Sequence, residues 1–166
     1  RANLDQEQLD PGPADQAEDV SRTLTRPRAE SMTPATEDQI IAGHKILLVD
    51  DDVRNLLALT PLLEGWGLSV TAAGDGYEAL EVLEDEEFSL VLMDIMMPEL
   101  DGYDTIRRIR GDARLRDLSV IALTAKTEDK DREACLEAGA DDFIAKPIDA
   151  GELKQLIARH LPFRPS

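Results

Sequence analysis

Hydrophobic residues gather into short continuous runs from residue 44 onward. Such runs are typical of strands that are covered on both faces of a parallel sheet. They stand at 45–50, 68–73, 88–94, 118–125 and 142–147. The pattern therefore predicts five buried strands.

Between these runs, apolar residues recur with a helical period. Stripes of this kind predict helices that pack one face against a sheet. They occupy 53–67, 76–87, 103–110, 127–140 and 149–161. The first contains Pro61, which should kink or shorten that helix. The last opens with Asp149, which we expect to act as its N-cap.

Five strands that alternate with five helices, joined by short connections, predict an α/β fold. We expect a doubly wound five-stranded parallel sheet of the flavodoxin-like (βα)5 kind, formed by residues 44–161. In such sheets, ligands bind at the carboxyl ends of the strands. Functional residues should therefore lie where the strands end.

The first 43 residues differ in composition from the rest. They include four prolines and many acidic and hydroxyl side chains, but no aromatic residue. A segment like this buries too little apolar surface to offset the entropy lost on folding. We predict a disordered linker at 1–43 and a short C-terminal tail at 162–166.

The net charge narrows the classes of partner. A formal charge of −17, from 35 acidic and 18 basic residues, repels nucleic-acid phosphates and anionic membranes. We therefore expect no nucleic-acid partner. No apolar run approaches the roughly 18 residues of a membrane span, so we expect no direct membrane insertion. The single Cys135 cannot form an internal disulfide, which fits a cytoplasmic location.

Acidic residues stand at two of the predicted strand ends. The segment VLMDIMMPELDG, residues 91–102, ends a buried strand on Asp94 and continues to an Asp-Gly pair, which predicts a turn. The first strand ends in Asp50, Asp51 and Asp52. If the strands are parallel neighbours, these carboxylates meet at one edge of the sheet.

Carboxylates that meet in this way repel each other unless positive charge lies among them. The candidates are a divalent cation and Lys146, which ends the fifth strand before Pro147. Carboxylate oxygens that leave some coordination positions free for water and phosphate oxygens are typical of a Mg²⁺ site, which we therefore predict here. Thr124, at the end of the fourth strand, completes a set suited to metal-assisted phosphoryl transfer. Each residue alone also has a structural explanation, and Asp52 should cap the following helix.

Other functions of related folds fit less well. An enzyme of the haloacid-dehalogenase type also uses a strand-end aspartate and Mg²⁺, but it needs a second aspartate where this chain has Met96. A flavodoxin needs a phosphate-binding loop where this chain has three aspartates. The sequence also lacks a GxxxxGK[ST] nucleotide loop.

The stretches ILLVDDD, VLMDIMMPELDG, VIALTA and DFIAKP together resemble the receiver domain of two-component response regulators. The resemblance spans about residues 44–161. The longer stretches DDDVRNLLAL, MDIMMPELDGYDTIRRIR and IALTAKTEDKDREACLEAGADDFIAKPID are most similar to receivers fused to hybrid sensor histidine kinases.

The resemblance implies a role for each residue at the strand ends. Asp94 would be the phosphoacceptor. Asp51, Asp94 and the main-chain carbonyl of Met96 would bind Mg²⁺ directly, and Asp50 would act largely through water. Thr124 and Lys146 would each bind a phosphoryl oxygen.

The resemblance also implies a switch. Phe143 matches an aromatic residue that changes rotamer with Thr124 on activation, and the Lys146–Pro147 peptide bond would be cis. Phosphorylation would shift the surface formed by 127–140, 142–147 and 149–161. That surface could support a weak homodimer, although nothing in the sequence requires one.

We therefore expect a phosphoacceptor domain that takes a phosphoryl group from a phosphohistidine on a histidine kinase or histidine phosphotransfer protein. The domain would not itself be a turnover enzyme, but its parent chain could be a membrane-tethered histidine kinase. The alternatives are a pseudo-receiver that binds proteins without being phosphorylated, and a stand-alone response regulator.

Two smaller features complete the picture. Neither Met96 nor Lys126 carries a side chain that orients an attacking water as an amide or carboxylate would, so we predict slow self-dephosphorylation. Five arginines lie between 107 and 116. We favour a solvated helix end for them over a docking site for an acidic partner.

Overall fold

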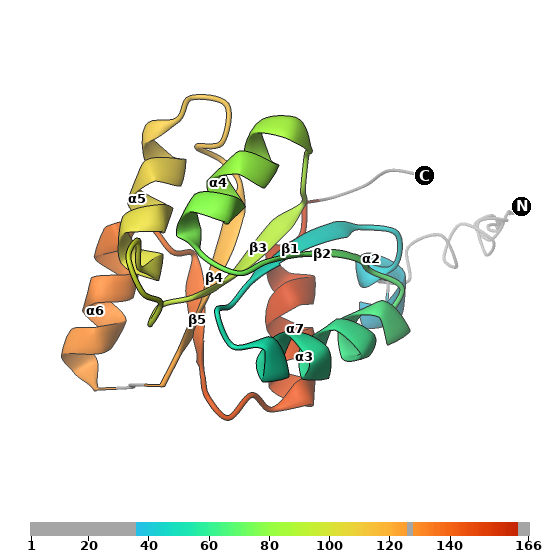
Figure 1. Cartoon of the computed structure of the whole chain (residues 1–166). Coiled ribbons are helices and arrows are strands. Elements are labelled where there is room, and N and C mark those ends of the chain that lie inside the picture. The colour runs from blue at the N-terminus through green and yellow to red at the C-terminus, as the bar shows by residue number, and fades with distance from the viewer. Residues whose placement is uncertain (1–35, 126–127, 163–166) are drawn as a thin grey trace, which may run out of the picture. The chain divides into compact units, whose positions relative to one another are not determined.

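The computed structural model describes residues 36–125 and 128–162, which form a five-stranded parallel sheet with helices on both faces (Figure 1). The strands are β1 (Lys45–Val49), β2 (Ser69–Ala73), β3 (Leu90–Asp94), β4 (Ser119–Thr124) and β5 (Asp142–Ala145). They lie in the order β2-β1-β3-β4-β5, and every neighbouring pair is parallel. This is the strand order of flavodoxin-like sheets, so the predicted fold class is confirmed.

The helices of the described residues alternate with the strands, after one short helix that precedes β1. They are α2 (Glu37–Ile41), α3 (Val53–Gly65), α4 (Gly76–Asp85), α5 (Gly102–Gly111), α6 (Asp129–Ala138) and α7 (Ala150–His160). Asp149 caps α7 as expected, because its carboxylate accepts a hydrogen bond from the Glu152 backbone N–H at 2.8 Å.

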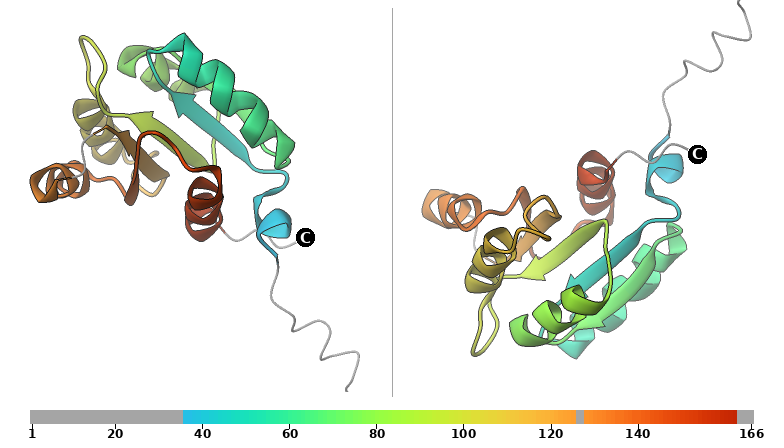
Figure 2. Two further views of the ribbon diagram at one scale, coloured as in Figure 1. Left: turned by 90° about the horizontal axis from the view of Figure 1, so that it is seen from below. Right: turned by 90° about the horizontal axis from the view of Figure 1, so that it is seen from above.

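The helices form two layers, one on each face of the sheet (Figure 2). α4, α5 and α6 pack against one face, where β1 contributes Leu47 and Val49. α2, α3 and α7 pack against the other, where β1 contributes Ile46 and Leu48. Successive side chains of a strand point to opposite faces. A strand that is covered on both sides must therefore be apolar throughout, which explains the continuous runs in the sequence.

The folded domain begins earlier than the expected residue 44. Thr36 caps α2 in a reciprocal capping box with Gln39. Ile41 is completely buried, and Asp38 forms an ion pair at 2.6 Å with Lys154 of α7. The predicted linker boundary at residue 43 is therefore wrong. A helix this short has no stability of its own, and its contacts with α7 are not visible in the local sequence.

The remaining terminal predictions lie mostly beyond the described part of the chain. The predicted linker is outside the described residues as far as residue 35, and so are residues 163–166 of the predicted tail. Among the described residues, no helix combines the length and apolar character that crossing a bilayer would require.

Pro61 does not shorten its helix. α3 continues through Pro61 to Gly65. Leu59 and Leu63, on either side of the proline, are both buried against the sheet. The packing of this stripe outweighs the loss of one backbone hydrogen bond, so the expectation of a shortened helix is wrong, and the alternative expectation of a kink stays a prediction.

The Asp-Gly pair at 101–102 begins a helix and does not form a free turn. Asp101 caps α5 by accepting a hydrogen bond from the Asp104 N–H at 2.9 Å. The Gly102 N–H donates to the Ile95 carbonyl at 2.9 Å. A Cβ at Gly102 would overlap the carbonyl oxygen of Asp94 and lie 2.6 Å from the Ile95 Cα. Only glycine permits this approach, which holds the start of α5 against the end of β3.

Candidate functional site

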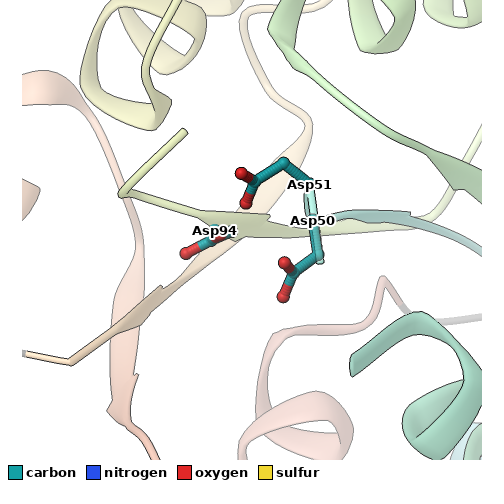
Figure 3. Close-up of side chains that lie close together, drawn as sticks. All are labelled: Asp50, Asp51 and Asp94. Atoms are coloured by element: carbon teal, nitrogen blue, oxygen red, sulfur yellow. The ribbon is translucent and has the colours of Figure 1, made fainter. Parts of the chain in front are cut away.

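The carboxyl ends of the strands bring the predicted acidic residues together. β1 and β3 are neighbours and pair Val49 with Met93, so the aspartates that follow these two residues lie side by side. Figure 3 shows the side chains of Asp50, Asp51 and Asp94 gathered at this edge. One carboxylate oxygen from each lies within 4.8 Å of the others.

Asp50 is completely buried and is oriented by the start of α3. Its Oδ1 accepts a hydrogen bond from the Asp52 backbone N–H at 2.9 Å. Its Oδ2 accepts one from the Asn55 side-chain amide at 3.0 Å. Asn55 was not among the predicted site residues. The available signal was its place in the first turn of a helix that starts at the strand end, because that turn faces back towards the strand.

Asp52 serves the helix and not the acidic cluster. Its Oδ1 accepts a hydrogen bond from the Arg54 backbone N–H at 2.9 Å, and its Oδ2 pairs with the Arg54 guanidinium at 2.9 Å. These hydrogen bonds lower the pKa of Asp52. The expected helix cap is confirmed, and Asp51, which is exposed to solvent, is left to face the cluster.

Asp94 is only 3% exposed and lies among both signs of charge. Lys146 Nζ donates to its Oδ1 at 3.1 Å, and the Met96 backbone N–H donates to the same oxygen at 3.3 Å. Burial, together with the negative charge of Asp50, raises the pKa of Asp94 to about 6, although the hydrogen bond from Lys146 acts in the opposite direction. Lys146 thus offsets the repulsion from Asp50, and burial of the carboxylate is what keeps the pKa of Asp94 raised.

Lys146 follows β5 and reaches across the sheet edge to the cluster. In addition to Asp94, its Nζ contacts Asp50 Oδ2 at 3.4 Å. Burial lowers the pKa of Lys146, but the hydrogen bond to Asp94 and the charges of both aspartates outweigh burial and raise it overall. The side chain is therefore a charged ammonium at neutral pH. Its peptide bond to Pro147 is cis, the geometry that the resemblance implied.

Thr124 and Phe143 lie at different depths from the strand ends. Thr124 is 4% exposed, and its carbonyl accepts a hydrogen bond from the Lys146 backbone N–H at 2.8 Å. Phe143 pairs in register with Ala122, two residues before Thr124. It lines a surface cavity of about 380 Å³ with residues of α6 and α7. The structure thus places Thr124 at the edge that carries the cluster and Phe143 at a separate surface.

Met96 is 59% exposed beside Asp94. The expected role of its carbonyl as a metal ligand stays a prediction. Lys126 lies outside the described residues, so the expected slow self-dephosphorylation also stays a prediction.

The donor set fits a magnesium ion. Three carboxylates supply hard oxygen atoms within 4.8 Å of one another. Asp51 is exposed, which leaves the site open to water and to phosphate oxygens. Mg²⁺ prefers such sites, with one or two carboxylates and several water ligands. Asp50, Asp51 and Asp94 would hold the ion, and the expected division into direct and water-mediated ligands stays a prediction.

Comparison with known proteins leads to one family. Residues 46–158 match the model of the response regulator receiver domain. The sensor histidine kinase GacS of Pseudomonas protegens is 33% identical over 148 residues, which make up 84% of this chain and 16% of that protein. The transcriptional regulatory protein CpxR homolog of Haemophilus influenzae is 46% identical over 109 residues, or 66% of this chain and 46% of that protein. The chain spans less than half the length of these two relatives.

Solved receiver domains share the fold. The receiver domain of a signal transduction histidine kinase from Syntrophus aciditrophicus is 35% identical, with a TM-score of 0.68 over 72% of this chain and 90% of that one. The receiver domain of a sensor histidine kinase from Pseudomonas aeruginosa PAO1 is 39% identical, with a TM-score of 0.67 over 72% of this chain and 98% of that one. The latter was solved with a magnesium ion coordinated in its active-site cleft.

Proposed function

Because this chain belongs to the response regulator receiver family of two-component signalling, we propose that it accepts a phosphoryl group on Asp94 with the help of Mg²⁺. One observation carries the proposal. The carboxylate of Asp94 lies within 4.8 Å of those of Asp50 and Asp51 and 3.1 Å from the ammonium of Lys146. An anion surrounded in this way is suited to receive a phosphoryl group once a divalent cation lowers the local negative charge.

The donor is a phosphohistidine on a histidine kinase or histidine phosphotransfer protein. A carboxylate oxygen of Asp94 forms a bond to phosphorus while the phosphorus–nitrogen bond of the phosphohistidine breaks. The departing imidazole keeps the electron pair of that bond and is protonated. The magnesium ion supplies charge neutralisation and orientation for this transfer.

Side chains of this protein stabilise the negative charge of the phosphoryl group as it is transferred. Lys146 already donates to Asp94 Oδ1, and after transfer the same ammonium pairs with a phosphoryl oxygen. Thr124, at the neighbouring strand end, donates its hydroxyl to another. Asn55 and the Asp52 N–H keep Asp50 in a fixed orientation. Little rearrangement is then needed when the phosphoryl group arrives.

The signal leaves through the surface formed by α6, β5 and α7. A phosphoryl group on Asp94 draws the Thr124 hydroxyl towards it, and Phe143 moves into the space released. This is a two-state equilibrium that a local contact biases. The same surface is where a weak homodimer would form.

Acetyl phosphate tests the proposal on the full chain. With Mg²⁺, intact-mass measurement should find one added phosphoryl group on the protein, and chelation of the metal with EDTA should abolish the addition. Asp94→Asn should prevent it. Asp117→Asn makes the same chemical change at an exposed aspartate at the opposite end of the sheet and should leave it intact.

The same experiment distinguishes two ways in which the proposal could fail. A pseudo-receiver that binds proteins without phosphorylation would gain no mass in any of the three proteins. Equal modification of the wild-type protein and Asp94→Asn would show that the phosphoryl group goes elsewhere, and it would reject Asp94 as the acceptor.

We also propose that the chain is the receiver of a hybrid sensor histidine kinase. The similarity to GacS, which extends over 84% of this chain, and to two histidine-kinase receivers of known structure supports this origin. The coding sequence upstream of Arg1 tests it. Kinase domains in the same reading frame are expected, and a start codon close to Arg1 would contradict the idea.

A further inference from the structure

The proposed switch residue Phe143 has a cationic neighbour on α6. The guanidinium carbon of Arg132 lies over the Phe143 ring, 5.4 Å from its centroid. A cation above the face of an aromatic ring is attracted by the ring's quadrupole. Both residues line the cavity of about 380 Å³ between α6, β5 and α7. Any movement of the Phe143 ring must therefore break or carry this contact.

Arg132 makes few other recorded contacts. Its backbone N–H bonds to the Glu128 carbonyl at 3.1 Å. Among the described residues, no carboxylate lies within 4.0 Å of its guanidinium, so it belongs to no ion pair. Glu128, which precedes α6, makes no side-chain cap. The contact with Phe143 therefore links the side chain of Arg132, in the first turn of α6, to β5.

Asp131, the residue before Arg132, has the opposite effect on the stability of the first turn of α6. Within the described residues, Asp131 Oδ2 is the one buried side-chain oxygen or nitrogen that has no hydrogen-bond partner. It lies towards α5, because its charge adds to burial in raising the pKa values of Cys135 and Tyr103. A buried oxygen without a partner destabilises the arrangement that buries it.

We propose that Arg132 and Asp131 set the switching equilibrium from opposite sides. Arg132 holds Phe143 in its resting position, whereas the buried and unpartnered Oδ2 of Asp131 favours release of the first turn of α6. The inference rests on the proposed function, since the equilibrium is the one that phosphorylation of Asp94 would shift. The two residues make the switch responsive, because neither state is strongly favoured before the phosphoryl group arrives.

The affinity for beryllofluoride, a mimic of an aspartyl phosphate, measures this equilibrium in the presence of Mg²⁺. A ligand that binds one state binds more tightly when that state is more populated. Arg132→Ala should therefore tighten binding by about two- to fivefold, the range expected for an exposed cation–π contact. Arg132→Lys retains a cation and should remain close to the wild-type protein.

Asp131→Asn should weaken the binding of beryllofluoride. It preserves the shape of the side chain but makes it neutral, which lowers the cost of leaving the buried atom without a partner, so binding should weaken by about two- to tenfold. Arg107→Ala is the matched control, because Arg107 is exposed on α5 and, among the residues that the structure describes, pairs only with Asp104 of the same helix. Its affinity should equal that of the wild-type protein.

Cys135 provides a second measurement that needs no phosphoryl chemistry. It is the only cysteine in the chain and lies completely buried on α6. The rate at which a thiol reagent modifies it reports opening of α6, and denaturant titration of the same proteins gives the part of any change that global unfolding contributes. Arg132→Ala should raise this rate about two- to fivefold.

The two measurements separate failure of this inference from failure of the proposed function. If the wild-type protein does not bind beryllofluoride, the proposed function fails, and the thiol measurement still tests the Arg132–Phe143 contact. If Arg132→Ala leaves both the beryllofluoride affinity and the Cys135 rate unchanged, the contact does not hold the resting state. If Arg132→Ala and Asp131→Asn both tightened or both weakened beryllofluoride binding, the two residues would not act in opposite directions and the proposal would be wrong.

Discussion

Arg110 is the arginine of the 107–116 cluster that the folded domain depends on. Its Nε donates to the Gly139 carbonyl at 2.8 Å. Its Nη1 donates to the carbonyls of Arg116 and Leu118 at 2.9 and 2.6 Å. Its Nη2 pairs with Asp141 at 2.9 Å. The guanidinium, with only 21% of the side chain exposed, joins the end of α5 to the segments that precede β4 and β5.

These contacts set the expected cost of Arg110→Ala. Three hydrogen bonds to carbonyls at about 1 kcal/mol each amount to about 3 kcal/mol, since charged donors lie at or above that value. The ion pair with Asp141, which is 41% exposed, adds little because solvent screens it. Asp141 also keeps a second partner, the Val120 N–H at 2.8 Å. We therefore expect Arg110→Ala to lower the free energy of unfolding by about 3 kcal/mol.

Urea denaturation followed by the fluorescence of Trp66 measures this change. Arg107→Ala removes the same side chain from the same helix but loses only an exposed pair with Asp104, and it should cost about 0.5 kcal/mol or less. Arg110→Lys should recover less than half of the loss, because an ammonium cannot span the fork of acceptors that a guanidinium reaches. If Arg110→Ala proved no more destabilising than Arg107→Ala, the structural role assigned to Arg110 would be wrong.

The other predictions concern the site. Asn55→Ala removes the side-chain donor to Asp50 Oδ2 and should weaken Mg²⁺ binding by about threefold to tenfold, measured by calorimetric titration. Unchanged affinity would mean that the Asp52 N–H alone orients Asp50. Gly102→Ala places a Cβ against the backbone of Asp94 and Ile95, so it should lower the free energy of unfolding by about 1–3 kcal/mol, measured by urea denaturation. A neutral result would show that α5 can shift away from β3 at no cost.

The arginine cluster is in fact a set of different contacts. Arg107 pairs within its own helix, Arg108 lies over the Tyr77 ring at 5.7 Å, and Arg110 is structural. The favoured expectation of a solvated helix end therefore holds for Arg107 but is wrong for Arg110. Sequence spacing could not separate them, because the acceptors of Arg110 come from segments up to 31 residues away.

The sequence by itself determined the order of elements and the residue types at the strand ends. A strand that is buried on both faces requires a continuous apolar run, and a helix that is buried on one face requires an apolar stripe. Both patterns can therefore be recognised in the local sequence. The end of α6 can be recognised in the same way, because Gly139 adopts a φ of 115° there, a conformation that favours glycine. The parallel topology then makes the strand ends of β1, β3, β4 and β5 meet. For this reason Asp50, Asp51, Asp94 and Lys146 could be expected in advance to lie together.

Only the tertiary structure decided which partners those residues have. Asn55 orients Asp50, Arg132 covers Phe143, and Ile41 extends the domain beyond its expected start. Each depends on where a helix lies against the sheet, and that position follows from the packing of whole faces rather than from neighbouring residues. Pro61 makes the same point in reverse, because the packing of Leu59 and Leu63 preserves a helix that local propensity alone would end.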